Sequence, residues 1–437
     1  MNRLDVSFDG CKVEYEEIIA VAEQCLPVID KVLAARTLGY ETEFASVNVP
    51  FDERLQQQVL ELVKEIRTYE PTMLIVIGIG GSNLGTKALS QSLFGVCGLH
   101  SPLKLFYVDT VDPDVVVPVM QQAETELQVG HRIVLTIVTK SGTTTETMAN
   151  AAIFIEMLKR YDQDHYAKSI VVITDTGTKL AHVAYDEGWH VLQVPALVGG
   201  RYSVFSAVGL FPLALLGVDI LSLHSSAAQM IDLCTERNVH INISARSAAL
   251  LYILYKRGFV IHNLFAFSVD LYELGLWYKQ LMAESLGKEY SVEGERVQTG
   301  ITPLVSVGST DLHSIVELHL GGPNNTGTTF VNVAQSHCQV SVPVSEPLDQ
   351  IVEHIQGKSL LTIMDAILDG TKYAYSVANR PFMSVALPDK SADTVAQFMQ
   401  WKMLEIIYLG YLLGIDPFVQ PQVELYKKKT RDLLARD

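Results

Sequence analysis

The sequence predicts an α/β protein with two doubly wound domains, and two patterns support this fold class. Short, uninterrupted apolar runs rich in β-branched residues recur along the chain, and amphipathic stretches of helical length separate them. Such runs are typical of parallel strands buried on both faces, with the intervening helices covering the two faces of the sheet. The strands predicted for the first half of the chain are 73–79, 103–109, 132–139, 169–175 and 189–195.

A second alternating block follows in the other half of the chain. Its predicted strands are 258–267, 301–309, 327–335 and 380–388, and its predicted helices are 269–287, 359–380, 396–413 and 421–436. The apolar run 204–216 is predicted to be a buried helix that precedes this block. Because 437 residues exceed the usual size of one domain, we expect a division into residues 1–215, with an N-terminal helical segment, and residues 216–437, with the closing C-terminal helices.

The composition argues against several classes of function. With 33 Lys and Arg against 49 Asp and Glu, the net charge is −16, which repels nucleic acid and acidic membrane surfaces. The five cysteines are scattered without a CxxC pair, so we expect neither a disulfide framework nor a metal site. The N-terminus lacks the apolar segment of a signal peptide, and no apolar run is long enough to cross a bilayer. These features predict a cytoplasmic protein.

A glycine-rich turn, 78–85, follows the first predicted strand and opens a helix. A dinucleotide-binding GxGxxG motif would need glycine where Asn83 stands, although Asp109 at the end of the next strand favours that reading. A Walker loop is excluded because Thr86 precedes Lys87, the reverse of the required order. The turn exposes backbone N–H groups at a helix start, which predicts a weak site for an anion or a hydroxyl group.

The segment 139–147, TKSGTTTET, also follows a strand and opens a helix. It gathers six hydroxyls, one lysine and one glycine in nine residues, and the helix N-terminus adds partial positive charge. Such a set of donors fits the oxygens of a phosphate monoester. The alternative is an ordinary helix cap, but a cap needs only one hydroxyl.

Arg201 stands on a glycine hinge, Gly199–Gly200, between a predicted strand and the apolar helix. Two glycines let the backbone turn sharply and approach a ligand closely. The guanidinium is always charged and presents five donors in a flat fork, which suits an oxyanion or a phosphate. The alternative is a turn whose arginine forms a surface ion pair.

Gln280 and Glu284 lie four residues apart near the end of a predicted helix, so their side chains share one face. Gly287 is the expected helix stop. A carboxylate in this place is a candidate general base, and the alternative is an ordinary surface glutamate. His313 follows another strand, and Lys427 heads a basic run at the start of the last predicted helix. A lone histidine is more often structural, and a basic run more often a solvated face.

These motifs, in this order, resemble those of glucose-6-phosphate isomerases of the bacterial type, over about residues 70 to 430. The resemblance implies two sugar-isomerase (SIS) domains of α/β/α type and a homodimer. It also implies reversible conversion of glucose 6-phosphate and fructose 6-phosphate, without metal or cofactor.

The resemblance also implies roles for individual residues. Glu284 corresponds to the base, Arg201 to the active-site arginine, and His313 to a histidine that reaches the site of the neighbouring subunit. Lys427 corresponds to a C-terminal lysine that, with His313, would move protons during ring opening. The implied substrate-binding residues are Gly81, Ser82, Thr139, Lys140, Ser141, Gly142, Thr143, Thr144, Gln280 and Gln420.

The sequence departs from the family pattern at three places. Gln422 and Tyr426 replace two glycines beside Lys427, Leu286 is bulkier than the usual residue, and 317–325 diverge. None of these changes removes a reacting group. Three alternatives remain open: an isomerase that also accepts mannose 6-phosphate, a non-catalytic sugar-phosphate sensor on the same fold, and a nicotinamide-dependent oxidoreductase.

Overall fold

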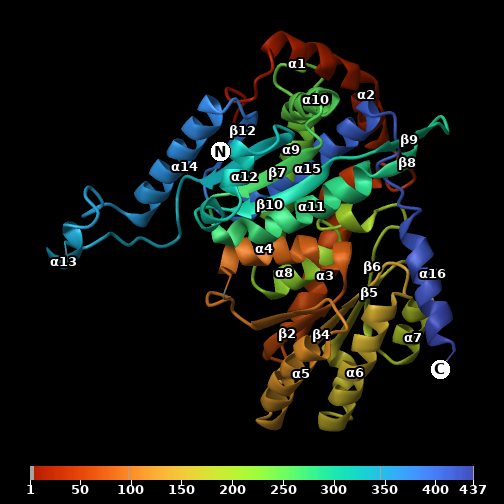
Figure 1. Cartoon of the computed structure of the whole chain (residues 1–437). Coiled ribbons are helices and arrows are strands. Elements are labelled where there is room, and N and C mark those ends of the chain that lie inside the picture. The colour runs from red at the N-terminus through yellow and green to blue at the C-terminus, as the bar shows by residue number, and fades with distance from the viewer. Residues whose placement is uncertain (1–3, 97, 345, 437) are drawn as a thin grey trace.

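The computed structural model describes residues 4–96, 98–344 and 346–436, which form two α/β units stacked on a shared set of helices (Figure 1). The first sheet has five parallel strands in the order β3-β2-β4-β5-β6. Their bounds are β2 (Pro71–Ile77), β3 (Lys104–Val108), β4 (Arg132–Val138), β5 (Ile170–Thr174) and β6 (His190–Gln193). Each of the five strands predicted for the first half of the chain is confirmed.

Alternation along each strand sends side chains into two different cores, as a doubly wound sheet requires. In β2, Leu74 and Val76 join the large central core, whereas Met73, Ile75 and Ile77 join a second core on the other face. The second core is shared with helices α5 (Pro113–Gln128), α6 (Thr145–Tyr161) and α7 (Lys179–Asp186). The central core includes side chains of α3 (Glu53–Arg67), α4 (Leu84–Phe94) and α8 (Ala207–Leu215).

The second sheet has the order β1-β12-β11-β7-β10, with β1 antiparallel to β12 and the other pairs parallel. Its strands are β1 (Asp5–Ser7), β7 (Ile261–Ala266), β10 (Thr302–Val307), β11 (Thr326–Val333) and β12 (Phe382–Leu387). The four predicted strands are confirmed, and β1 was not predicted. The expected boundary after residue 215 separates the two sheets except for β1, which lies before it in sequence and pairs in the second sheet.

Helices also cover both faces of the second sheet. Phe265, Phe330 and Phe382 pack on one face with α12 (Val316–Gly321) and α14 (Leu360–Val377). The other face turns toward the central core and contributes to it with α10 (Ile243–Lys256), α11 (Tyr272–Leu286) and α15 (Ala392–Leu412). Both sheets therefore meet one central helical layer, which also holds α9 (Ile220–Cys234).

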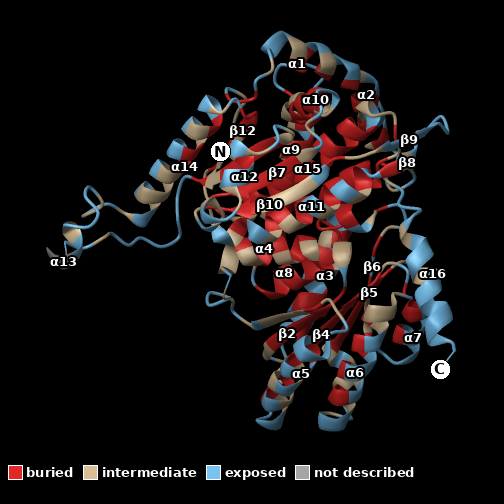
Figure 2. Cartoon of the chain, viewed as in Figure 1, coloured by how far each residue is buried: buried red, intermediate tan, exposed pale blue. Residues whose placement is uncertain are grey.

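The central layer buries two predicted helices almost completely (Figure 2). Every residue of α8 is buried, as the apolar run 204–216 predicted, and α15 is buried without a break from Thr394 to Gly410. Because α15 carries charges into this layer, they are paired: Lys402 Nζ lies 2.7 Å from Glu405 Oε2. Tyr278 on α11 donates to the other oxygen of Glu405, also at 2.7 Å.

The remaining elements lie at the periphery. Two helices, α1 (Tyr15–Ala22) and α2 (Leu26–Ala35), cover one end, and a hairpin of β8 (Lys288–Tyr290) and β9 (Arg296–Thr299) follows α11. Residues 335–344 and 346–358, with α13 (Glu346–Asp349), reach away from the body, and α16 (Val423–Leu434) runs along its outside without a buried residue (Figures 1 and 2). Within the described ranges, the helices are all too short or too polar to span a membrane.

Candidate active site

Arg201 is the centre of the candidate site. It lies in a 3-10 turn, η6 (Gly200–Tyr202), that follows β6, and only 1% of its side chain is exposed. Its Nε donates to Ser285 Oγ at 2.7 Å and its Nη2 to the carbonyl oxygen of Pro417 at 2.5 Å. Its Nη1 donates to Gln420 Oε1 at 2.8 Å and to Glu284 Oε2 at 3.3 Å. A buried guanidinium needs such partners, and the surface ion pair considered from the sequence is ruled out.

Glu284 occupies the last turn of α11, where both of its carboxylate oxygens are held. Gln280 Nε2 donates to Oε1 at 3.1 Å, from one helical turn earlier on the same face, and Arg201 contacts Oε2. One third of the Glu284 side chain nevertheless remains exposed. The carboxylate is therefore oriented on one side and open to a ligand on the other, as a general base requires.

The glycine turn after β2 packs directly against Arg201. It forms η4 (Gly80–Ser82), and a Cβ at Gly81 would lie 2.2 Å from the carbonyl carbon of Gly200 and 2.6 Å from the backbone nitrogen of Arg201. Gly80 has φ +61°, and a Cβ there would lie 3.0 Å from Gln280 Nε2. Only glycine fits this approach of two backbones. The ends of β2 and β6 and the last turns of α11 thus converge.

The hydroxyl-rich loop lies beside this turn, because β4, which it follows, pairs with β2. Thr139 is buried, and its Oγ1 lies 3.0 Å from Thr144 Oγ1, while Ser141 Oγ accepts from both the N–H and the hydroxyl of Thr143. Thr144 is the N-cap residue of α6, yet its side chain makes no cap hydrogen bond. The Thr144 hydroxyl is therefore not used as an ordinary cap, and these hydroxyls contact only one another or groups of the same loop.

Lys140 adds a positive charge to this loop. Burial lowers the pKa of its ammonium from the usual value, and the nearby Asp175 opposes that shift. Gly142 has φ +66°, which lets the loop turn between Ser141 and Thr143. The loop therefore combines a partly desolvated cation, several hydroxyls and the N-terminus of a 17-residue helix.

The structure does not bring His313 or Lys427 into this cluster. His313 ends η8 (Thr310–His313), is exposed, and makes no hydrogen bond or ion pair with any residue in the described part of the chain. Lys427 lies on the outer helix α16, where its Nζ donates to Glu424 Oε1 at 2.9 Å. Of the residues expected near Arg201, Gln280, Glu284, Gln420 and Gly81 are assembled, and these two are not.

Three neighbours of Arg201 were not predicted from the sequence. Ser285 and the carbonyl of Pro417 accept its hydrogen bonds, and Lys288 is a buried cation close by. Ser285 and Lys288 lie close to the candidate base Glu284 in the sequence, on either side of Leu286 and Gly287. This closeness could have marked them as candidate site residues. Nothing in the sequence marks the carbonyl of Pro417.

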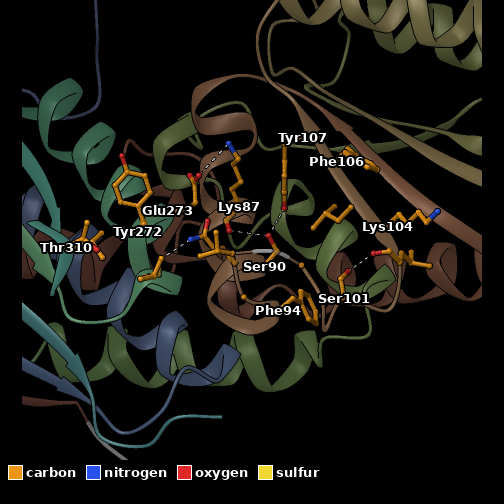
Figure 3. Close-up of a pocket in the computed structure, with 18 of the residues that line it drawn as sticks. Lys87, Ser90, Phe94, Ser101, Lys104, Phe106, Tyr107, Tyr272, Glu273 and Thr310 are labelled. Atoms are coloured by element: carbon orange, nitrogen blue, oxygen red, sulfur yellow. Dashed lines mark hydrogen bonds and ion pairs between the residues drawn. The ribbon is translucent and has the colours of Figure 1, made fainter. Parts of the chain in front are cut away.

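A hollow of about 790 Å³ lies elsewhere, at the edge strand β3 between α4 and α11 (Figure 3). Lys87 points toward Glu273, at 3.6 Å, and Ser90 meets the Tyr107 hydroxyl at 2.8 Å. Lys87 also pairs with Asp109, which accepts from Asn83 as well. None of the predicted site residues lines this hollow, so the candidate site is the cluster around Arg201.

The groups around Arg201 are suited to an anionic ligand. In the part of the chain that the structure describes, no three His, Cys, Asp or Glu residues gather as ligands of a metal ion. What the cluster offers is an oriented carboxylate, a buried guanidinium and a hydroxyl-rich loop. These groups can hold a phosphorylated ligand and move a proton.

A family model described as phosphoglucose isomerase matches residues 63–436, which is most of the chain. The chain belongs to the phosphoglucose isomerase family. A glucose-6-phosphate isomerase of Lactobacillus delbrueckii subsp. bulgaricus is 32% identical, over 99% of this chain and 96% of that protein. This family membership agrees with the resemblance expected from the five motifs.

Two solved structures share the fold over nearly the whole chain. A hypothetical protein of Thermus thermophilus matches with a TM-score of 0.86 at 29% identity, covering 100% of both chains. A glucose-6-phosphate isomerase of Chlamydia trachomatis matches with a TM-score of 0.83 at 20% identity, covering 99% of this chain and 88% of that one. The expected fold class, α/β with two doubly wound units, is thereby confirmed.

Lys288 is expected to make the free energy of unfolding of this protein change with pH in the alkaline range. Burial, followed by the charge of Arg201, lowers the pKa of its ammonium from 10.5 to about 8. Between these values the unfolded chain binds a proton that the native state has released, so this group makes the free energy of unfolding rise with pH. We expect the difference in unfolding free energy between wild type and Lys288→Met to shift in favour of wild type from about pH 7.5 to about pH 9.5. Urea denaturation at the two pH values measures this, and a constant difference would contradict the assignment.

Proposed function

We propose that this chain is an aldose–ketose isomerase that interconverts glucose 6-phosphate and fructose 6-phosphate, as a step of glycolysis and gluconeogenesis. The observation that carries the proposal is the carboxylate of Glu284, fixed at both oxygens by Gln280 and Arg201 yet one third exposed. The Glu284 carboxylate lies near the glycine turn η4 (Gly80–Ser82), and the hydroxyl-rich loop 139–147 lies next to that turn. Membership of the phosphoglucose isomerase family and the names of the relatives supply the substrate.

In this proposal the loop 139–144 holds the phosphate, through the hydroxyls of Thr139, Ser141, Thr143 and Thr144, the turn at Gly142 and the charge of Lys140. Gly81 and Ser82 approach the sugar. Gln280 and Gln420 orient Glu284 and Arg201, because each donates to or accepts from one of them.

The chemistry is a proton transfer between two adjacent carbons. Glu284 takes the proton from carbon 2 of the open-chain aldose, and the electron pair forms the double bond of an enediol while the carbonyl oxygen on carbon 1 gains negative charge. Arg201 faces that charge, which is the kind of preorganised stabilisation that lowers barriers most. Glu284 then returns the proton to carbon 1, where the electron pair of the double bond forms the new C–H bond. The proton lost from the hydroxyl on oxygen 2 is balanced by the one taken up by the charged oxygen on carbon 1, which leaves a ketone at carbon 2 and a hydroxyl at carbon 1. No electron acceptor is needed.

His313 and Lys427 serve ring opening in this proposal. Because both lie away from the cluster around Arg201, each must be brought to a site by other means. Because His313 is exposed and unpaired within the described chain, we propose that it reaches the site of a second copy in a homodimer with shared active sites. Lys427 lies seven residues after Gln420, which contacts Arg201, and the proposal requires α16 to move so that the Lys427 amine leaves Glu424 and reaches the site. A glycolytic enzyme of this kind would work in the cytoplasm.

A coupled assay tests the proposed function. Purified protein is given fructose 6-phosphate, glucose 6-phosphate formation is followed through its oxidation, and a chelator is present throughout. We expect turnover that the chelator leaves unchanged. Absence of turnover while the sugar phosphate still raises the thermal midpoint would contradict an enzyme and indicate a sugar-phosphate sensor.

The hydroxyl-rich loop gives a separate expected result. Replacing Ser141 by Ala and Thr144 by Val should raise KM for fructose 6-phosphate about 10-fold or more while changing kcat less, because each lost hydrogen bond to a charged group is worth about 1.5–3 kcal/mol. Thr125→Val on the outer helix α5, whose hydroxyl bonds only to its own helix, is the control. An unchanged KM in the double variant would place the phosphate elsewhere.

A further inference from the structure

Lys288 sits directly beneath the turn that carries Glu284. It is the first residue of the β8–β9 hairpin, it is 9% exposed, and it pairs across the hairpin with Thr299. Its Nζ donates to the carbonyl oxygen of Glu284 at 2.6 Å and to that of Ser285 at 2.9 Å. The last carbonyls of a helix have no partner within the helix, so this amine closes the C-terminus of α11.

The two residues whose carbonyls Lys288 holds also accept from Arg201 with their side chains, beside Gln420 and the carbonyl of Pro417. Ser285 Oγ accepts from Arg201 Nε at 2.7 Å, and Glu284 Oε2 accepts from Arg201 Nη1 at 3.3 Å. Ser285 Oγ also lies 2.9 Å from the hydroxyl of Tyr202, the residue after Arg201. One amine therefore fixes the backbone of two of the four residues that accept hydrogen bonds from the guanidinium.

The hairpin itself is seated against the helix end. Gly300, which follows β9, approaches so closely that a Cβ there would lie 3.2 Å from the Cα of Gly287. The backbone at Lys288 is therefore held where the hairpin meets the end of α11. Its charged neighbours are Arg201, Asp416 and Glu284, so its amine lies among the groups of the site.

We propose that Lys288 is a positioning residue of the isomerase. By holding the carbonyls of Glu284 and Ser285, it keeps the Glu284 carboxylate and the Arg201 guanidinium in the relative positions that the proton transfer needs. This inference rests on the proposed function, because its main readout is turnover. Lys288 does not touch the substrate in this arrangement, since its donors are directed at two carbonyls. Its effect is expected in kcat and not in binding of the phosphate, which is held by a different loop.

The test compares Lys288→Met, which keeps the length of the side chain but removes its donors, with Lys279→Met on α11, the helix whose end Lys288 closes. Lys279 is exposed, and its side chain makes no hydrogen bond or ion pair with the described residues. We expect Lys288→Met to lower kcat about 10- to 100-fold with KM within about threefold, because displacements of about 1 Å at reacting groups have effects of this size. Lys279→Met should match wild type, and Lys288→Arg, which keeps donors and charge, should restore part of the lost kcat.

The result must be separated from a loss of folding. Circular dichroism and the thermal midpoint give the folded fraction, and kcat is referred to that fraction. A purely structural Lys288 would lower the folded fraction and leave this kcat within about twofold of wild type, which would overturn the inference while the proposed function stands. No turnover in wild type would overturn both.

A second variant keeps the inference testable if Lys288→Met does not fold. Ser285→Ala removes one buried hydroxyl and leaves the Lys288 contacts with the backbone in place. Because Arg201 Nε then loses its acceptor, we expect kcat to fall about 10-fold at similar KM. A kcat equal to that of wild type in Ser285→Ala would show that the last turn of α11 does not hold Arg201, and would overturn the inference.

Discussion

Glu284→Gln is expected to lose at least about 10²- to 10⁴-fold in kcat, the usual contribution of a general base. The amide keeps the shape of the side chain and one oxygen for Arg201, but it cannot accept a proton at neutral pH. KM should change little, because the phosphate-holding loop is not altered. Steady-state kinetics in both directions, with the thermal midpoint as a check of folding, measure the effect.

Glu293→Gln is a matched control for this change. Glu293 is exposed in the turn of the β8–β9 hairpin, and its side chain makes no hydrogen bond or ion pair with the described residues. Its variant should behave like wild type. If Glu284→Gln retained near-normal turnover in a folded protein, Glu284 would not be the base, and the carboxylate between Gln280 and Arg201 would have another role.

Arg201→Met is expected to lower kcat about 10²- to 10³-fold, the size of effect seen when one preorganised donor to an oxyanion is removed. It should also lower the free energy of unfolding, because the carbonyl of Pro417 and the hydroxyl of Ser285 lose their donor inside the protein. Each buried polar group left without a partner costs about 1–3 kcal/mol. Turnover and urea denaturation of the same preparation measure both effects.

Arg201→Lys separates charge from geometry. A lysine keeps the positive charge but cannot make the forked contacts to Ser285, Pro417 and Gln420 together, so we expect it to restore little of the activity. Arg237→Met serves as the control, since Arg237 forms an exposed pair with Asp30. An Arg201→Lys enzyme with wild-type kcat would mean that a point charge suffices and that the fork has no part in catalysis.

The fold was largely predictable because its strands are buried on both faces. Runs such as 73–79 have no polar face, so length and β-branched content identified them, and the predicted helix 269–287 contains α11. Strand β1 could not be found in this way. It is three residues long and pairs antiparallel at the edge of a sheet whose other strands lie more than 250 residues later in the sequence.

The part of the candidate site that follows the ends of strands was predictable from the sequence. The turn at Gly81, the loop at Thr139 and Arg201 all follow parallel strands of one sheet, so they meet at one edge. Glu284 and Gln280 come from a helix of the other half, and only packing brings them there. The contacts that fix Arg201 through Pro417 and Gln420 join residues 216 and 219 positions apart, which no local pattern reveals.

Isomerisation of fructose 6-phosphate in D₂O, followed by NMR to equilibrium over many turnovers, tests the central claim most directly. If Glu284 carries the proton between carbon 1 and carbon 2, its carboxyl group exchanges with solvent during some turnovers. Deuterium should then accumulate at carbon 2 of the glucose 6-phosphate formed. Turnover that leaves carbon 2 free of deuterium would mean that hydrogen passes directly between the carbons, and would contradict proton transfer by Glu284.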